Sequence, residues 1–136
     1  MSEDVDAKEI EALALRFMGD YKEWNDKAMA IDEEYGWQSD KANNMVSESY
    51  RKLIDNYCLP DHKHNPISYA TNSSHDPMKS KTLGFEISGD FAVLKTELSK
   101  SEYYKPKYEY HFKNIDGKWY LDEIYLDDDG ELLPGL

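Results

Sequence analysis

The stretch Tyr108–Ile124, YEYHFKNIDGKWYLDEI, decides the fold class of this 136-residue chain. Apolar and polar side chains alternate through it, which predicts one strand over Tyr104–Lys113 and another over Lys118–Leu126. Asp116-Gly117, which lies between them, is typical of a two-residue hairpin turn. The apolar positions change phase late in the second strand, so we expect a β-bulge at Asp122-Glu123.

The same two-residue period continues upstream and predicts a larger antiparallel sheet. Lys81–Ile87 and Phe91–Leu98 both alternate, and Ser88-Gly89-Asp90 separates them with residues typical of a turn. Pro66–Tyr69 is expected to form a short first strand, followed by the polar stretch Thr71–Pro77. The strands are therefore expected over roughly residues 66–126.

The N-terminal part has a helical period instead. Apolar residues recur at three- and four-residue steps from Asp6 to Glu34 and again from Ser39 to Cys58. Ser39 is typical of an N-cap, and Pro60 disfavours helical geometry in the residue before it. In the second helix the residues expected to face inward are Met45, Val46, Ser49, Tyr50, Leu53, Ile54 and Tyr57.

Helices followed by antiparallel strands predict a single α+β domain over residues 1–136, with the N-terminal helices packed on a curved sheet. We expect the sheet to curl around its helices into a cone, which leaves a concave pocket at the open end. The residues that such a pocket would draw on are aromatic: Tyr21, Trp24, Tyr50, Tyr69, Tyr108, Tyr110 and His111.

The charge distribution favours a basic partner over a nucleic acid. The net charge is −12, and both ends are acidic: residues 1–40 carry 12 acidic and 4 basic side chains, and residues 116–136 carry 7 and 1. Nucleic-acid phosphates bind Lys and Arg, so direct nucleic-acid binding is disfavoured. A basic protein would be attracted electrostatically. Solubility is the other property that such acidity serves.

Cysteine usage and hydropathy predict a cytoplasmic protein without membrane contacts. Cys58 is the single cysteine, so no intrachain disulfide can form and a cysteine-based metal cluster is excluded. Its place on the apolar side of a helix predicts a buried, inert thiol. The sequence has no leader of basic and then apolar residues, and no apolar run of about 20 residues that would span a bilayer.

Several motifs carry a family resemblance that runs from Pro66 to the C-terminus. They are Pro66–Tyr69 (PISY), His75-Asp76-Pro77, Phe91–Thr96 (FAVLKT), Tyr108–Phe112 (YEYHF) and Asp116–Ile124 (DGKWYLDEI). Together they resemble the nuclear transport factor 2-like immunity proteins, which bacteria encode beside polymorphic toxins.

This resemblance implies a protein that binds and neutralises a cognate toxin domain by stoichiometric sequestration, with no catalysis and no cofactor. Such toxins are often nucleases with basic surfaces, which fits the acidic ends of this chain. We therefore expect a partner-binding site in which aromatic side chains act as anchors beside acidic ones. The predicted residues are Asp122, Glu123, Asp127, Asp128, Asp129 and Glu131 for charge, and Tyr103 and Tyr104 as anchors.

Two other functions remain as alternatives. One is a small-molecule-binding protein or an isomerase- or dehydratase-like enzyme that uses the interior of the cone. The other, compatible with toxin binding, is a homodimer that pairs through an exposed face of the sheet. His75-Asp76-Pro77 is expected to have a structural role, since adjacent residues rarely form a base with its orienting carboxylate.

No metal site is predicted. Asp61, His62, His64 and His75 offer ligands, but their spacing fits a solvated loop rather than a zinc site. Asp127–Glu131 resembles the start of a calcium loop, yet the bidentate Glu at the twelfth position would fall beyond Leu136.

Overall fold

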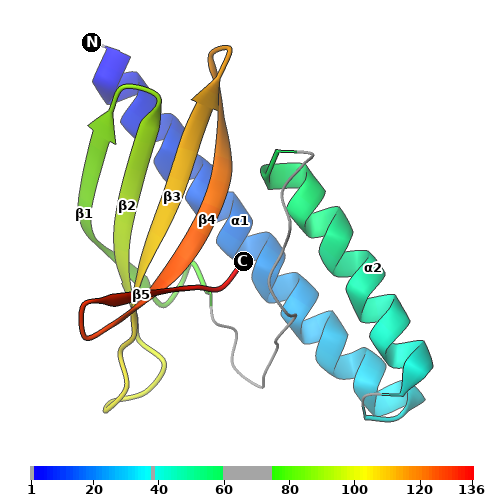
Figure 1. Cartoon of the computed structure of the whole chain (residues 1–136). Coiled ribbons are helices and arrows are strands. Elements are labelled where there is room, and N and C mark those ends of the chain that lie inside the picture. Colours follow the sequence, from blue (N-terminus) through cyan, green and yellow to red (C-terminus); the bar gives the residue numbers. More distant parts are fainter. Residues whose placement is uncertain (1, 38, 60–74) are drawn as a thin grey trace.

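The computed structural model describes residues 2–37, 39–59 and 75–136 and has an α+β architecture (Figure 1). The two N-terminal helices are α1 (Ser2–Tyr35) and α2 (Asp40–Tyr57). The strands that follow are β1 (Ser80–Ser88), β2 (Phe91–Leu98), β3 (Lys107–Ile115), β4 (Lys118–Asp128) and β5 (Glu131–Pro134). They form one antiparallel sheet in the order β1-β2-β3-β4-β5. The predicted α+β class is confirmed, but the sheet is neither closed nor strongly curled, so it does not form the expected cone (Figure 1).

The two helices begin and end where local chemistry requires. Gly36 has a φ of +99° and ends α1, because residues with a Cβ rarely adopt this backbone conformation. Ser39 is the predicted N-cap of α2, and its hydroxyl accepts a hydrogen bond of 3.2 Å from the Ala42 N–H. The prediction that Met45 faces inward was wrong: it is exposed, because it lies beside the buried stripe that runs from Ala42 through Val46 and Tyr50.

Both predicted hairpins are present, and the predicted bulge is confirmed. Asp116 and Gly117 both have positive φ values, 53° and 85°, as the turn between β3 and β4 requires. His111 pairs with Glu123 while Phe112 pairs with Leu121, so Asp122 has no residue opposite it on β3.

The sheet differs from the prediction at the start of β3, at the end of β4, which reaches Asp128 rather than Leu126, and in an added strand, β5. β3 begins at Lys107 rather than Tyr104, because the Pro106 carbonyl accepts a hydrogen bond of 2.8 Å from the Leu98 N–H and closes a loop there. The strand β5 was not predicted, since its four residues follow an acidic run that is typical of a turn. The predicted strand Pro66–Tyr69 lies outside the described residues.

The core lies between the helices and one face of the sheet, called here the inner face. α1 runs behind this face, and α2 packs beside α1 (Figure 1). Phe17 and Trp24 of α1 are buried against the same cluster as Tyr110 and Leu121 of the sheet. Packing of this kind accounts for most of the stability of helices in a domain.

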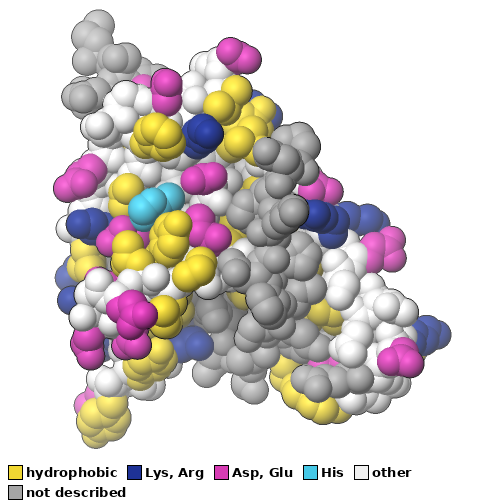
Figure 2. Space-filling model, in the orientation of Figure 1, with side chains coloured by type: hydrophobic (Ala, Val, Ile, Leu, Met, Phe, Trp, Pro, Cys, Tyr) yellow, Lys and Arg dark blue, Asp and Glu magenta, His cyan; other side chains and the backbone are white. Residues whose placement is uncertain are grey.

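The opposite, outer face of the sheet carries charges of both signs between apolar side chains (Figure 2). One row across four strands alternates in sign: Lys81 lies opposite Glu97, Glu97 opposite Lys107, and Lys107 opposite Asp127. Opposite charges that face each other across strands are stabilising, so the charges in this row largely balance one another within the sheet. Neither described helix has both the length and the hydropathy needed to cross a bilayer.

Candidate protein-binding site at the acidic end of the sheet

The C-terminal acidic residues form the tip of a hairpin, which we call the acidic hairpin: Asp127, Asp128, Asp129 and Glu131. Asp127 and Asp128 end β4, Asp129 and Gly130 make the turn, and Glu131 begins β5. Asp129 and Gly130 have φ values of 51° and 93°, so this is a second tight turn of the Asp-Gly kind. The Gly130 N–H donates to the Asp127 carboxylate at 2.8 Å, and thus one carboxylate of the four also builds the turn.

Charge in the acidic hairpin opposes the stability of the hairpin. Asp128 lies directly opposite Glu131 in the pairing of β4 with β5, and both residues are exposed. Like charges directly opposite each other across strands are destabilising. A Lys at either position would replace this repulsion with attraction.

The loop between β2 and β3 lies beside the acidic hairpin and contributes an aromatic side chain (Figure 1). A hollow of about 420 Å³ separates the two segments. Its described lining consists of Tyr104–Lys107 from the loop and the start of β3, and Leu126–Gly130 from the hairpin. The hollow therefore unites Tyr104 with Asp127, Asp128 and Asp129, as the prediction of a shared site requires.

Local hydrogen bonds hold Tyr104 at the hollow. Its N–H donates to the Ser101 hydroxyl at 2.9 Å, and its carbonyl accepts from the Ser101 N–H at 3.1 Å. The Tyr104 side chain is 54% exposed, so its ring has a large area left to bury against a partner. Tyr103 is 93% exposed and does not line the hollow, which separates the two predicted anchors.

Lysines on the loop side give the hollow a mixed charge. Lys105 and Lys107 line it, and Lys107 is the cross-strand neighbour of Asp127. The acidic hairpin thus keeps Asp128, Asp129 and Glu131 directed at solvent, with Asp127 balanced within the sheet. The arrangement suits a partner that brings Lys or Arg to the outer rim of the hollow and an apolar contact to Tyr104.

The other two predicted acidic residues lie apart from this hollow. Asp122 is the exposed bulge residue of β4. Glu123 has a structural role, because its carboxylate accepts hydrogen bonds of 2.9 Å from the N–H groups of Ile124 and Leu136. It thereby fastens the buried C-terminal Leu136 against β4.

The interior that would serve an enzyme is centred on His75. His75 is buried, and its Nδ1 shares a hydrogen bond of 2.7 Å with the Tyr110 hydroxyl. A cavity of about 210 Å³ beside it has aromatic lining from Tyr21 and Tyr108 and apolar lining from β4 and β5. Burial lowers the pKa of His75 to about 3, and burial also raises the pKa of Tyr110 well above its ordinary value.

Several predicted pocket residues are elsewhere. Tyr50 is in the core beside Trp24, with ring centroids 4.8 Å apart, and Tyr69 lies outside the described residues. The expectation that His111 lines the interior was wrong, because it alternates with Tyr110 and so faces the outer side of the sheet. There its Nε2 lies 2.9 Å from the Glu109 carboxylate and its ring meets that of Tyr125 edge to face.

The sequence did not lead us to predict the outer-face cluster of Glu109, His111 and Tyr125. Alternation already implies it, since Tyr108, Tyr110 and Phe112 are predicted to share the opposite face. Cys58 is buried as predicted, and burial raises its pKa to about 12. Of the residues considered for a metal, Asp61, His62 and His64 lie outside the described residues. The described residues contain no group of three or more His, Cys, Asp or Glu side chains that could hold a metal ion.

Comparison with known proteins leaves the function to be argued from this geometry. No protein-family model matches the chain. No curated protein and no solved structure matches it either.

Proposed function

We propose that the protein is an immunity protein that binds a cognate bacterial toxin domain and neutralises it by stoichiometric sequestration. The observation that carries the proposal is the hollow that Tyr104 lines together with Asp127, Asp128 and Asp129. These residues come from segments more than twenty positions apart and together offer an aromatic anchor with a rim of carboxylates. Clustered anchors beside charged rims are typical of sites that bind proteins.

The electrostatics of the acidic hairpin support a basic partner. The Asp128 and Glu131 pair raises the free energy of the unbound protein, and a Lys or Arg from a partner would relieve that repulsion on binding. The chain as a whole carries a net charge of −12, so long-range attraction would accelerate the encounter with a basic nuclease-like domain. The expected complex needs no cofactor, and its expected location is the cytoplasm.

The chemistry of the interior favours binding over catalysis. A general base works best when its pKa lies near the working pH, and burial places the pKa of His75 at about 3. The Tyr110 hydroxyl, whose pKa is raised, is a poor proton donor in the same site. An isomerase- or dehydratase-like activity is the competing function, and the cavity of about 210 Å³ beside His75 is the observation in its favour.

The resemblance to nuclear transport factor 2-like immunity proteins adds the remaining support. It rests on five motifs from Pro66 onward, of which those of β3 and β4 are the most telling, and two helices that precede an antiparallel sheet agree with it. That family resemblance predicts a cone, which is a more strongly curled sheet than the open one observed.

Growth rescue combined with co-purification tests the proposal. If a neighbouring gene encodes a large secreted protein, the C-terminal domain of that protein is the candidate toxin and would be expressed with and without this chain. We expect survival and a one-to-one complex only with the chain present. Continued killing without a complex would refute the proposal for that pair. Rescue without a complex, accompanied by conversion of a small molecule, would favour the enzyme.

The two tyrosines provide a matched pair of variants for locating the site. Tyr104→Ala is expected to weaken the complex by about tenfold or more, since a buried aromatic anchor contributes strongly to affinity. Tyr103→Ala removes the same kind of ring from the adjacent position, which does not line the hollow, and is expected to change affinity less than about threefold. Equal losses for the two variants would remove the hollow from the interface.

A further inference from the structure

Among the described strands, β1 lies at one edge of the sheet. It pairs with β2 on one side, and no strand of the described part of the chain pairs with it on the other (Figure 1). Edge strands of this length present unpaired N–H and C=O groups that invite another strand. At nine residues, Ser80–Ser88, β1 is long enough to hold a partner strand along its whole length.

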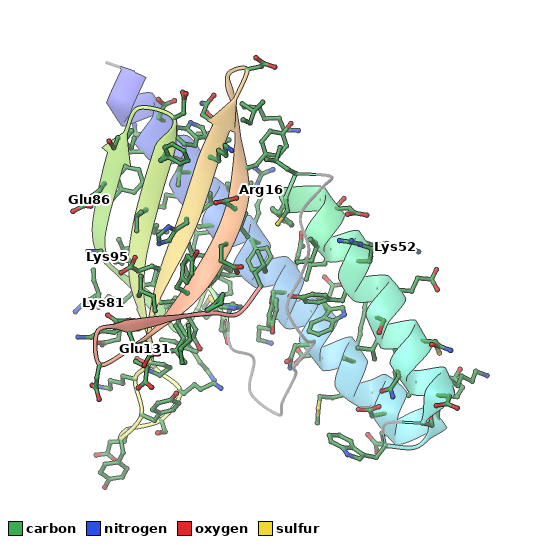
Figure 3. The ribbon with its side chains drawn as sticks, viewed as in Figure 1. Arg16, Lys52, Lys81, Glu86, Lys95 and Glu131 are labelled. Carbon is green, nitrogen blue, oxygen red and sulfur yellow. The ribbon has the colours of Figure 1, made fainter. Side chains whose placement is uncertain are left out.

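A bulge in β1 places two opposite charges on the same face. Thr82 pairs with Thr96 and Gly84 with Lys95, so Leu83 is the extra residue of a bulge. Because of it, Lys81 and Glu86 both face the outer side of the sheet although they are five positions apart. Lys81 lies opposite Glu97, and Glu86 lies opposite Val93. Figure 3 shows both side chains at the free side of the sheet.

The phase of the β1–β2 ladder determines which residues offer hydrogen bonds to a new strand. Ser88 and Phe91 flank the two-residue turn, so they form a hydrogen-bonded pair, and such pairs then alternate along the hairpin. The two bulge residues count as one step in this alternation. The backbone groups that point toward the open edge then belong to Ile87, Phe85, Thr82 and Ser80.

When β1 pairs antiparallel with a second copy of β1, the outward backbone groups and the opposite charges match in a single register. If two copies run antiparallel about an axis between Leu83 and Gly84, Ser80 faces Ile87 and Thr82 faces Phe85. Every one of these residues offers outward backbone groups, as a hydrogen-bonded pair requires. In the same register Lys81 of each copy faces Glu86 of the other, on the same side of the sheet.

We propose that β1 pairs antiparallel with β1 of a second copy of this chain in this register, which joins the two sheets into one continuous sheet. The register makes two symmetric Lys81–Glu86 pairs between the copies, as an interface with a two-fold axis must. It also accounts for Leu83, an apolar side chain that is 46% exposed on the bulge. The axis passes beside Leu83, so the two copies of this side chain would cover each other.

Charge variants test the register. Sedimentation velocity over a wide range of concentrations would compare wild type with Glu86→Lys, which places two Lys pairs across the axis. We expect wild type to dimerise and Glu86→Lys to have a dimer dissociation constant about 30-fold higher. Adding Lys81→Glu to Glu86→Lys restores opposite charges across the axis, and we expect the double variant to regain most of the lost affinity.

Lys95→Glu is the matched control, since Lys95 lies on the outer face of β2, one strand in from the edge (Figure 3). It would weaken a dimer that pairs through the face of the sheet and leave an edge-to-edge dimer unchanged. Thermal unfolding of each variant shows whether it folds. A wild type that stays monomeric throughout, or a dimer that responds to Lys95→Glu and not to Glu86→Lys, would overturn the proposal.

Lys81→Cys with Glu86→Cys gives a second, covalent readout. The two positions are about 16 Å apart along one strand, which is too far for a disulfide within a copy. Oxidation is therefore expected to produce a covalent dimer, and Cys58 is buried and does not compete. Absence of the covalent dimer in folded protein would contradict the register.

Discussion

Reversing one charge of the acidic hairpin is expected to stabilise the free protein while it weakens the complex. Glu131 lies opposite Asp128 across the turn, and both residues are exposed, so Glu131→Lys replaces a repulsive pair with an attractive one. Residues retained for stability rarely behave in this way, whereas residues retained for binding often do. The sign of the change is therefore as informative as its size.

The size follows from the cross-strand geometry. A charged pair directly opposite on two strands changes stability by about 0.2–1 kcal/mol, unfavourably for like charges and favourably for opposite ones. The reversal is thus expected to raise the free energy of unfolding by about 0.5–1.5 kcal/mol, and the melting temperature by about 2–5 °C. Urea unfolding should show a higher midpoint with an unchanged slope, because the surface exposed on unfolding stays the same.

Two control variants separate the pair from the overall charge. Glu131→Gln removes the repulsion without adding attraction and should give about half of the gain. Glu11→Lys makes the same change in net charge at an exposed position of α1 and should give much less. The gain should shrink as salt is added, since exposed charges are screened. An equal gain from Glu11→Lys, or a gain that does not depend on salt, would refute the reasoning.

Three further predictions concern the buried residues. Tyr110→Phe removes the hydrogen bond to buried His75 and is expected to lower the free energy of unfolding by about 1–3 kcal/mol in urea titrations; no loss would show that the hydroxyl contributes nothing. His75 has an ordinary pKa of about 6.5 when unfolded and a pKa of about 3 when folded. The unfolded chain therefore takes up the proton first, and stability should fall as pH drops from about 6.5 toward about 3. His75→Gln should flatten that fall, measured by urea unfolding across this range; identical pH profiles for wild type and His75→Gln would count against the burial effect. Cys58, whose pKa burial raises to about 12, should react with a thiol reagent at neutral pH only after urea unfolding, and fast labelling of the folded protein would contradict its burial.

Much of the fold could be predicted because local chemistry and periodicity agree in this sequence. The Asp-Gly turn at 116–117 and the alternation around it specify both long C-terminal strands, and the phase change before Ile124 predicted the bulge. β5 escaped prediction because its four residues have no periodicity of their own and depend on pairing with β4.

The candidate site could be predicted only in part. The acidic residues and the tyrosines stand out by composition, yet their meeting depends on how the loop before Lys107 closes. That closure joins residues far apart in sequence, and a single chain gives no local signal for it. The misplacement of His111 has a different origin, since the alternation with Tyr110 and Phe112 already assigned it to the outer face.

The affinity of the proposed toxin partner, once growth rescue has identified it, for the acidic hairpin tests the central claim most directly. Calorimetry at two salt concentrations would compare wild type with Asp127→Asn, Asp128→Asn and Asp129→Asn combined. The control combines Glu9→Gln, Glu11→Gln and Glu33→Gln, which remove the same charge from exposed positions of α1. We predict about a tenfold or greater loss of affinity and a weaker salt dependence for the hairpin variant alone. Wild-type affinity and salt dependence in the hairpin variant would contradict the claim.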